Sequence, residues 1–375
     1  MSEKALGIIT PAANYIHVDG LQDFRPIGAF SFLGRFRVID FPISNMSNSG
    51  IDRIQIYVGG QPRSIVEHVG RGRQYNINSK RGKVQLLFNH KNDSTSIYNN
   101  DIAYFYENLQ LLERAHQDYV IIAPSYMVYK QDFNKMIDEH IESGADISLL
   151  CHKVNNAKEA YRNCCIINVD KDKKFAGIGF NMGNAKEKTI FMDTYCMKRE
   201  LFIKLIKDAR SISSAYYLAN IVHAKRDELN IRIASHKGYF AALTSFNDYF
   251  KASMAILDID IDVAEGVFND PAWPFYTMTT DACPTKYLDN SKVCNSLISN
   301  GCIIGGTVEN CIIGRNVTIE EGAVVKNSVI SAYSTIKAGV RVENTVVDKW
   351  AKLIHPDYIA GTPDKPAYIK RNDTI

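Results

Sequence analysis

The sequence contains no C-x-x-C pair and no long apolar run, and both absences narrow the functions open to it. Its eight cysteines lack the paired spacing of zinc sites, and most of them fall in apolar, strand-like segments. We therefore expect reduced core cysteines in preference to metal ligands or disulfides. No stretch approaches the roughly 18 consecutive apolar residues of a membrane span, and the N-terminal residues do not resemble a signal peptide. These features predict a cytoplasmic protein without a membrane partner.

The sequence also has little excess charge of either sign. Its net charge is +3 over 375 residues, of which 23% are charged. This balance leaves no basic stripe of the kind that nucleic acids require, so nucleic-acid binding is not expected. Hydrophobic residues make up 46% of the chain, and its length is sufficient for two domains with buried cores.

Residues 1–258 alternate short β-rich runs with helix-patterned stretches. The β-rich runs are residues 6–9, 53–58, 119–123 and 146–151, and helices are expected over about 101–116 and 247–257. A further helix should stop at Gly144, with one face formed by Phe133, Met136, Ile137, His140 and Ile141. The alternation predicts an α/β fold with a doubly wound, mostly parallel sheet, in which His140 is a core residue.

The last part of the chain has a different period. Apolar residues recur at six-residue steps, interrupted by one step of five, at Ile313, Ile319, Val325, Ile330, Ile336 and Val342. A period of six fits a parallel β-helix, in which each side of a coil contributes one inward residue, better than it fits a small β-sandwich. We therefore expect an α/β domain over residues 1–258, an irregular linker or arm over 259–290, and a β-helix with its tail over 291–375.

Three segments together resemble one family. Residues 32–51 read FLGRFRVIDFPISNMSNSGI, the linker contains WPFYT at 273–277 and PTKY at 284–287, and the hexapeptide tail follows. This combination is similar to the ADP-glucose pyrophosphorylases, the glucose-1-phosphate adenylyltransferases of glycogen and starch synthesis. The resemblance implies a Rossmann-like nucleotidyltransferase domain and a C-terminal left-handed parallel β-helix. It also implies a reaction of ATP with glucose 1-phosphate, with magnesium held by two carboxylates.

The residues that this chemistry needs are missing at the matching positions. In place of the family's glycine-rich phosphate loop the chain has TPAANYIHVDGL, where Pro11 lacks an N–H and Tyr15 is bulky. The family's two metal-binding aspartates fall on Tyr126 and Ala242, which do not replace carboxylates on magnesium at neutral pH. The GTADA, KPAVP and FxEKP motifs are also altered. We therefore expect no catalytic residues, no bound metal and no cofactor.

This pattern resembles the noncatalytic GlgD-type subunit of the bacterial enzyme, which assembles with an active GlgC-type subunit. The resemblance implies a regulatory subunit whose partner is the catalytic homologue, in a mixed tetramer that makes ADP-glucose for glycogen. The family binds sugar-phosphate or phosphate effectors between its two domains through basic residues of the matching region. The effector or anion-binding candidates are therefore Arg35, Arg37, Arg53, Arg71 and Arg73, although a solvated or paired role competes for the last two.

Other polar residues of this region are assigned structural roles. Asp40, Ser44, Asn45 and Asn48 lie in a turn-rich segment, where they are expected to cap helix ends and fix the turn. The isolated residues His68 and His355 are expected to be structural or exposed.

Two further functions remain open. One is an active nucleotidyltransferase whose metal ligands have moved to Asp101, Asp132 or Asp248, and the other is a free-standing sugar-phosphate sensor. A hexapeptide acyltransferase is disfavoured, because residues 293–354 contain no histidine to act as its base.

Overall fold

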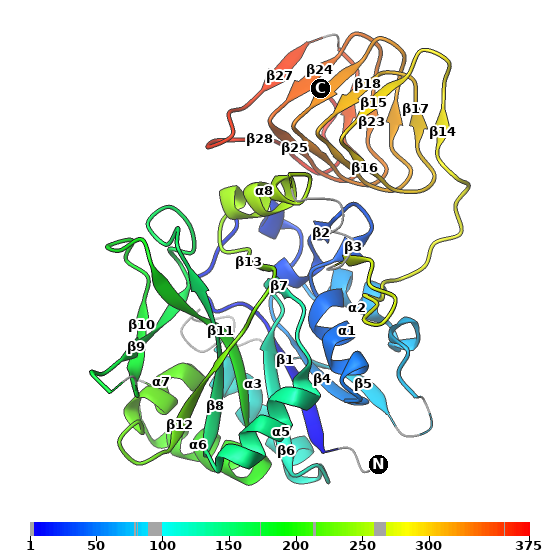
Figure 1. Cartoon of the computed structure of the whole chain (residues 1–375). Helices are drawn as coiled ribbons and strands as arrows, with labels where there is room; N and C mark the ends of the chain where they lie inside the picture. Colours follow the sequence, from blue (N-terminus) through cyan, green and yellow to red (C-terminus); the bar gives the residue numbers. More distant parts are fainter. Residues whose placement is uncertain are drawn as a thin grey trace.

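The computed structural model describes residues 4–78, 80, 82–88, 100–172, 174–212, 215–258, 268–355 and 357–375. These residues form an α/β domain and a three-sided β-helix that lies against one end of it (Figure 1). Among them, no helix has the length and apolar character needed to cross a bilayer.

The α/β domain is built on a nine-stranded mixed sheet. Its parallel part has the order β6 (Tyr119–Pro124), β1 (Ala5–Thr10), β4 (Arg53–Val58) and β5 (Lys83–Phe88). On the other side of β6, the long strand β11 (Lys188–Lys198) runs antiparallel to β6, β8 (Ile147–Val154) and β9 (Cys165–Val169). Two strands complete the sheet at its margins: β10 (Phe175–Phe180) beside β9 and β12 (Ile231–Ser235) beside β8. The α/β fold is as expected, with its parallel pairing concentrated around β1.

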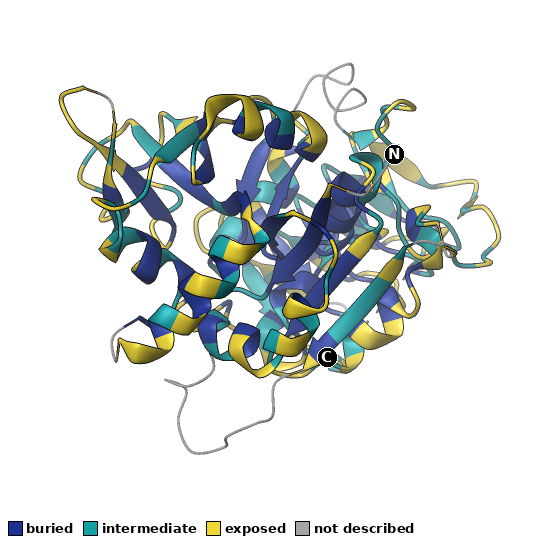
Figure 2. Cartoon of the chain, turned by 90° about the horizontal axis from the view of Figure 1, so that it is seen from below, coloured by how far each residue is buried: buried dark blue, intermediate teal, exposed yellow. Residues whose placement is uncertain are grey.

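Different helices cover the two faces of this sheet. Alternate residues of β1 point into two separate cores, with Ile9 in one and Ile8 in the other. The first core is covered by α1 (Asp40–Asn48), α2 (Arg63–Val69) and α5 (Phe133–Ser143). The second is covered by α3 (Asp101–Glu107), α4 (Leu109–Glu113), α6 (Arg199–Ser211) and α7 (Leu218–Ala224). Figure 2 shows buried strands between helices whose outer sides are exposed, as a doubly wound domain requires.

The helix predictions hold with two corrections. Helix α5 ends at Gly144, which has φ 63°, and His140 is buried with Nδ1 2.9 Å from Ser148 Oγ. Ile141 was expected on the buried face but is 44% exposed, because it lies at the edge of the apolar stripe. The single helix expected over 101–116 is divided at Asn108 into α3 and α4.

The cysteines are free in the structure. Six of them are buried, as expected of core residues, while Cys283 and Cys294 are exposed.

The C-terminal part is the left-handed parallel β-helix that the hexapeptide period predicts. Its first sheet contains β14 (Lys286–Tyr287), β17 (Ile303–Ile304), β20 (Thr318–Ile319), β23 (Thr335–Ile336) and β26 (Lys352–Leu353). The second contains β15 (Lys292–Cys294), β18 (Thr307–Glu309), β21 (Val324–Lys326), β24 (Arg341–Glu343) and β27 (Tyr358–Ala360). The third contains β16 (Leu297–Ile298), β19 (Ile312–Ile313), β22 (Val329–Ile330), β25 (Thr345–Val347) and β28 (Ala367–Ile369). The six apolar residues of the hexapeptide series are all buried inside, and the stacked strands begin before residue 291, at β14.

One corner of the β-helix is formed by a column of asparagines. Asn295, Asn310, Asn327 and Asn344 have φ values of 42°, 51°, 44° and 46°. Asparagine tolerates this left-handed conformation better than most residues. The amides also bond along the column, from Asn295 Nδ2 to Asn310 Oδ1 at 2.7 Å and from Asn310 Nδ2 to Asn327 Oδ1 at 3.2 Å. At each of these four positions the sequence thus has a residue that tolerates the left-handed backbone conformation.

The third sheet of the β-helix lies against the α/β domain. Its outward residues Ile312, Val329 and Val346 are buried in the core of the α/β domain, whereas the residue after each of them points into the β-helix. Outward positions of the other two sheets are largely polar, so the sequence itself marks the third sheet as the buried face. Helix α8 (Phe246–Ala255) lies at the same boundary, as Figure 1 shows.

A buried ion pair joins the two domains. Arg25 Nη2 lies 2.5 Å from Asp348 Oδ1, with side chains 4% and 0% exposed. Tyr368 donates its hydroxyl hydrogen to the other carboxylate oxygen of Asp348 at 3.0 Å. Together with the apolar contact, this pair fixes the β-helix on the α/β domain.

Residues 268–277 of the arm pack on helix α1. Phe275 lies against Phe41, with ring centroids 4.9 Å apart. Three polar residues of α1 bond to the arm: Ser44 Oγ accepts from Tyr276 N (2.9 Å), Asn45 Oδ1 from Trp273 Nε1 (3.0 Å), and Asn48 Nδ2 donates to Pro274 O (2.9 Å). A structural role for these residues is confirmed, although they hold the arm rather than cap a helix end.

Candidate functional site

Tyr126 and Ala242, which are distant in the sequence, lie side by side beyond the carboxyl ends of β1 and β6. Strand β7 (Met127–Tyr129) pairs with β13 (Phe240–Ala242), with Ala242 opposite Met127. Leu243 N donates to Tyr126 O at 2.9 Å, and both side chains are buried. The carboxyl edge of parallel strands is where ligands of α/β proteins usually bind. The fold therefore brings together the two positions at which the sequence resemblance places metal-binding aspartates.

Neither of these side chains suits a magnesium ion. Burial raises the pKa of Tyr126 well above its ordinary value, and the charge of Asp193 raises it further. The phenol therefore keeps its hydrogen and donates it to Asp193 Oδ2. Ala242 contributes only a methyl group, whereas magnesium prefers carboxylate and water oxygens. Within the described ranges, no group of three or more histidine, cysteine, aspartate or glutamate residues is arranged to hold a metal ion.

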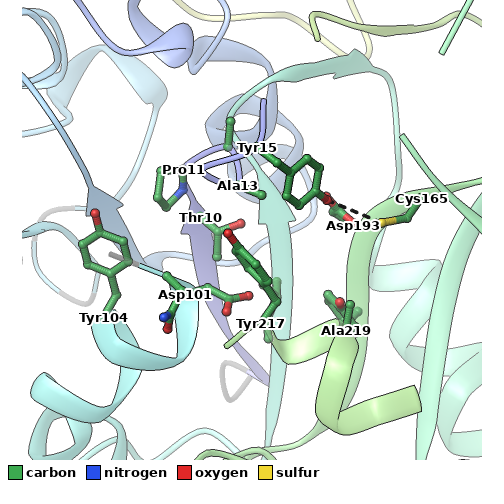
Figure 3. Close-up of a pocket in the computed structure, with 14 residues that line it drawn as sticks. Thr10, Pro11, Ala13, Tyr15, Asp101, Tyr104, Cys165, Asp193, Tyr217 and Ala219 are labelled. Atoms are coloured by element: carbon green, nitrogen blue, oxygen red, sulfur yellow. Dashed lines mark hydrogen bonds between the residues drawn. The ribbon is translucent and has the colours of Figure 1, made fainter. Parts of the chain in front are cut away.

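A small, mostly enclosed cavity, called the closed cavity below, lies at the carboxyl end of β1 (Figure 3). Beside it is a larger and more open cavity of about 580 Å³, which shares with it Pro11, Ala12 and Tyr104. The volume of the closed cavity is about 50 Å³, room for only a few water molecules and far less than a nucleotide needs. Tyr15 lies across it, with its hydroxyl 3.5 Å from Cys165 Sγ. The Tyr15 ring packs edge-on against Phe180 and Tyr217, with centroid distances of 5.2 and 5.8 Å. The loop after β1 thus places an aromatic side chain across the closed cavity.

Two carboxylic acids line this cavity. Burial raises the pKa of Asp193 to about 6 and that of Asp101 to about 7. Asp193 lies at an irregularity in β11 with φ 44°, and Asp101 begins α3 and accepts from Leu218 N at 3.1 Å. Sequence reasoning missed Asp193, although a carboxylate within the apolar run IFMDTYCM is the signal that marks it.

The other aspartates considered as relocated ligands have local partners. Asp132 caps α5 by accepting from Lys135 N at 3.2 Å. Asp248 accepts from Thr244 Oγ1 at 2.7 Å in the first turn of α8. Neither lines the closed cavity, so Asp101 alone of the three belongs to it.

The arginine candidates are divided by the structure. Arg35 and Arg73 line an open cavity together with arm residues 275–279, whereas Arg53 and Arg71 are exposed and do not line it. Arg37 is turned inward, and its Nη1 donates to Ala29 O at 2.5 Å. The five arginines therefore do not form one site.

A buried network positions Arg37. Asp40 Oδ2 accepts from Arg37 N at 2.8 Å, and Asp40 Oδ1 lies 2.6 Å from both His68 Nε2 and the Tyr75 hydroxyl. His68 and Asp40 are both buried, so their expected structural roles are confirmed, and His355 is exposed.

Basic residues from both domains meet at the boundary. Burial lowers the pKa of Lys349 to about 6, and the positive charges of Arg37, Arg25 and Arg371 lower it further, against the opposing effect of Asp348. We call Arg25, Arg37, Lys349 and Arg371 the interdomain cluster. Sequence reasoning found neither Lys349 nor Arg371, because only the folded chain brings the end of the β-helix beside residues 25–37.

A further arginine links the β-helix to the arm. Arg315 donates from Nη1 to Thr280 Oγ1 at 2.7 Å and from Nη2 to Met278 O at 3.0 Å. Burial lowers the pKa of Arg315, and the charge of Arg35 lowers it further, so these two cations lie close together. Positive charge therefore extends from the interdomain cluster to the open cavity at Arg35.

Comparison with known proteins assigns both parts of the chain. A nucleotidyl transferase family model matches residues 25–177, and a model of the GlmU-like C-terminal hexapeptide matches residues 283–365. The chain is 31% identical to "Glycogen biosynthesis protein GlgD" of Geobacillus stearothermophilus, over 86% of this chain and 83% of that protein. It is 30% identical to the protein of the same name from Bacillus subtilis, over 99% of this chain and 96% of that protein. It is also 27% identical to "Glucose-1-phosphate adenylyltransferase" of Fervidobacterium nodosum, over 86% of this chain and 77% of that protein.

Proposed function

Because this chain belongs to the family of GlgD glycogen biosynthesis proteins and glucose-1-phosphate adenylyltransferases, we propose that it is a regulatory subunit without catalysis of its own. The names of its relatives support a role in glycogen biosynthesis. The observation that carries the proposal is the meeting of Tyr126, in the turn before β7, with Ala242 at the end of β13, where adenylyl transfer would need metal-binding carboxylates.

The residues that line the cavities at the carboxyl edge argue against adenylyl transfer. The reaction builds negative charge on the phosphates, so a working site surrounds them with cations and N–H donors. The closed cavity is instead lined by two aspartates and by neither lysine nor arginine. Its volume of about 50 Å³ is too small for a nucleotide, and the neighbouring cavity of about 580 Å³ is lined, among the described residues, by neither aspartate nor glutamate that could hold magnesium. On these grounds we propose that the chain uses no magnesium and no other cofactor.

The proposed partner is a catalytic homologue, in a mixed tetramer. The first coil of the β-helix supports an association of this kind, because the outer edges of β14, β15 and β16 pair with no other strand of the described chain. Exposed apolar side chains lie on this coil, with Tyr287 53%, Leu297 40% and Val293 39% exposed. Open strand edges beside apolar side chains favour association with another protein surface.

The domain boundary supports a role in effector binding. The interdomain cluster brings three arginines and Lys349 together beside Asp348, and Arg35, Arg73 and Arg315 extend the positive charge. Arginine and lysine in this number favour a phosphate or sugar-phosphate ligand. An anion held between the two domains would contact both of them. Coupling to a partner subunit requires in addition that these contacts differ between two states of the complex.

A second candidate function is an active enzyme with relocated ligands. It is favoured by one observation, that Asp101 and Asp193 line the same cavity. In this case the purified chain alone would form ADP-glucose, and Asp193→Asn would abolish that activity.

The decisive experiment compares the purified chain, a catalytic homologue and the two co-expressed proteins. ADP-glucose formation is measured with ATP, magnesium and glucose 1-phosphate. We expect no turnover by this chain alone, co-elution of the two proteins, and saturation curves for the complex that differ from those of the homologue. Turnover by the lone, contaminant-free chain at a rate like that of its relatives would refute the proposal. Failure to co-elute would instead favour a free-standing sensor.

A further inference from the structure

A further open cavity lies beside β9, the strand at the left of Figure 1. Its volume is about 840 Å³, which is within the range of small-molecule sites. It is formed by the end of β8, the segment that follows β8, the end of β9 and the beginning of β11. Among the described residues, it shares no lining residue with the two cavities at the carboxyl edge or with the one at Arg35. We call it the β9 cavity.

The β9 cavity is lined by polar side chains that make no hydrogen bond or ion pair within the part of the chain that the structure describes. They are Lys153, Asn155, Asn156, Asn168, Glu187 and Lys188. Ammonium and amide groups donate hydrogen bonds, whereas carboxylate and amide oxygens accept them. The lining therefore offers both kinds of group to a ligand.

Two hydrogen bonds also fix an imidazole acceptor at this cavity. His236 Nε2 lies 3.1 Å from Lys130 O, and His236 Nδ1 lies 2.9 Å from His152 Nδ1. Because a carbonyl oxygen only accepts, His236 donates from Nε2 and accepts at Nδ1 from His152. Burial lowers the pKa of both rings, to about 4 for His236, so both are neutral. His152 lines the β9 cavity, and its Nε2 therefore carries a lone pair without a hydrogen.

An aromatic residue of the lining has a strained backbone conformation. Tyr161 has φ 59°, in the left-handed region that bulky residues rarely adopt. Its hydroxyl donates to Phe240 O at 3.2 Å, and its ring is stacked on the Phe240 ring, with centroids 5.4 Å apart and planes 11° apart. Phe240 thus covers one face of this ring, and the rest of the ring is left to border the cavity. Strained positions of this kind concentrate at functional sites.

The mixture of donors and acceptors favours a neutral ligand with many hydroxyl groups over an anion. A hydroxyl group both donates and accepts, so it matches lysine and amide hydrogens as well as His152 Nε2 and Glu187. A phosphate group is an acceptor, and a second acceptor at His152 and a negative charge at Glu187 both disfavour it. The apolar face of a sugar ring can in addition pack on the aromatic ring of Tyr161.

We propose that the β9 cavity binds a neutral oligosaccharide, with a sugar ring against Tyr161 and a sugar hydroxyl donating to His152 Nε2. Because relatives of this chain are named for glycogen biosynthesis, an α-linked glucan is the first source to test. The inference goes beyond the proposed regulatory function. A glucan bound at this cavity would hold the subunit near the polymer, whether or not the subunit changes the activity of a partner.

The test is calorimetric titration of the full-length protein, without a partner, with maltotriose, cellotriose and inorganic phosphate. We expect saturable binding of at least one trisaccharide. Tyr161→Asn and His152→Phe should each weaken it about three- to tenfold, the size of one aromatic contact or one hydrogen bond. Asparagine suits the backbone of Tyr161, and phenylalanine keeps a ring beside Phe240, which lies 5.1 Å from the His152 ring.

Two further variants make the test independent of folding defects. Glu187→Ala removes an exposed acceptor that has no partner within the described residues, so it should weaken trisaccharide binding without changing the fold. Tyr358→Asn is the matched control for Tyr161→Asn, because Tyr358 is an exposed tyrosine of the β-helix. We expect this control to bind the trisaccharide as the natural protein does.

Each outcome has a defined meaning. Tighter binding of maltotriose identifies an α-linked glucan, and tighter binding of cellotriose identifies a β-linked one. The inference is overturned if neither trisaccharide binds at about 10 mM, or if all three cavity variants bind as the natural protein does. Binding of phosphate alone that these variants abolish would mark an anion site and also overturn it, as would their loss of association with the catalytic homologue without any saccharide binding. Since the lone chain is titrated, absence of saccharide binding leaves the regulatory function intact, and turnover by the lone chain refutes that function without touching this inference.

Discussion

The closed cavity at the carboxyl edge of the sheet and the domain boundary are two places where charged side chains gather, and they differ in the sign of their charge. The edge holds a cavity of about 50 Å³ lined by Asp101 and Asp193, with Tyr15 lying across it. The boundary instead holds the interdomain cluster, whose Arg371 lies beside the exposed ring of Trp350. The difference shows that one fold presents opposite electrostatics at two places, with acids at the edge and basic residues at the boundary.

The two regions also differ in whether their charged groups have hydrogen-bond partners within the chain. At the edge, each carboxyl group accepts a hydrogen bond from the chain, Asp193 from Tyr126 and Asp101 from Leu218 N. At the boundary, the buried Nε of Arg371 has no acceptor within the described residues. The two acids at the edge thus have donors within the chain, whereas a buried donor at the boundary has no acceptor among the described residues. The following predictions test this contrast, beginning with the largest expected effect.

The largest effect is expected at the ion pair that joins the domains. Asp348→Ala would leave Arg25 buried without its counter-charge and remove the acceptor of Tyr368. We expect a loss of about 3–5 kcal/mol in the free energy of unfolding, measured by urea denaturation. The double variant Arg25→Met with Asp348→Leu, which removes both charges, should lose much less. A loss below about 1 kcal/mol for Asp348→Ala would show that the domains are not held together by this pair.

A smaller change, a gain in the free energy of unfolding, is expected when Asp193 in the closed cavity is replaced. The pKa of Asp193 is about 6 in the folded protein, above the value of about 3.9 in an unfolded chain. The folded state therefore binds this proton more tightly, and the resulting stability is present at low pH and lost as pH rises through about 6. Asp193→Asn removes the ionised form, so at pH 8 we expect a gain of about 1–3 kcal/mol.

The pH profile of urea denaturation checks this prediction. Asp193→Asn should flatten the profile between about pH 4 and pH 7. Asp132→Asn is the control, because asparagine caps a helix as well as aspartate does and this position lies outside the cavity. A loss of stability in Asp193→Asn at pH 8 would mean that the charged carboxylate is favourable where it lies, as a cation-binding site would require.

The fold was more predictable from the sequence than the site, for a physical reason. Helix α5 and the inward residues Ile313 and Val325 follow from periodicities of a few residues, which the sequence displays directly. Local pattern did not reveal the antiparallel course of β11 or the break at Asn108. Neither feature changes the apolar period that identifies the fold.

The candidate sites depend on contacts between distant segments. The meeting of Tyr126 with Ala242 could be anticipated only because both were matched to one family motif pattern. Lys349 comes from a coil that no local signal connects to Arg37. Of these residues, only Asp193 could have been recognised from the local sequence, because it is an acid within an apolar strand.

The third prediction concerns Lys349. Its pKa of about 6 lies far below the usual value for lysine, so at pH 8 it is neutral among Arg25, Arg37 and Arg371, with Asp348 as the nearby acid. A bound anion favours the charged form, so binding takes up a proton, and affinity should fall as pH rises above about 6. Sulfate is the suitable probe because it does not itself titrate in this range. We expect about a tenfold weaker affinity at pH 8 than at pH 6.

The proton uptake that accompanies sulfate binding is measured by calorimetry in buffers of different ionisation enthalpy. Lys349→Met should bind sulfate weakly and with little pH dependence, while Lys352→Met, at an exposed position of the same β-helix, should behave like the natural protein. Proton uptake that persists in Lys349→Met would assign the titration to another group. The closed cavity should contribute nothing to sulfate binding, because its charged residues are acids.

The smallest changes in stability are expected at two corner columns of the β-helix. One is the asparagine column, and the other contains Tyr333 and Trp350, which have φ values of 65° and 60°. Asn327→Tyr places a bulky residue at φ 44° and removes the acceptor of Asn310, so we expect a loss of about 1–2 kcal/mol in urea denaturation. In Tyr333→Asn, relief of the same strain is offset by loss of the stacking on Trp350, which contributes about 0.5–1.5 kcal/mol. The net change should therefore lie between zero and a gain of about 1 kcal/mol. If Tyr333→Asn were as destabilising as Asn327→Tyr, the aromatic pair would be part of the structural framework.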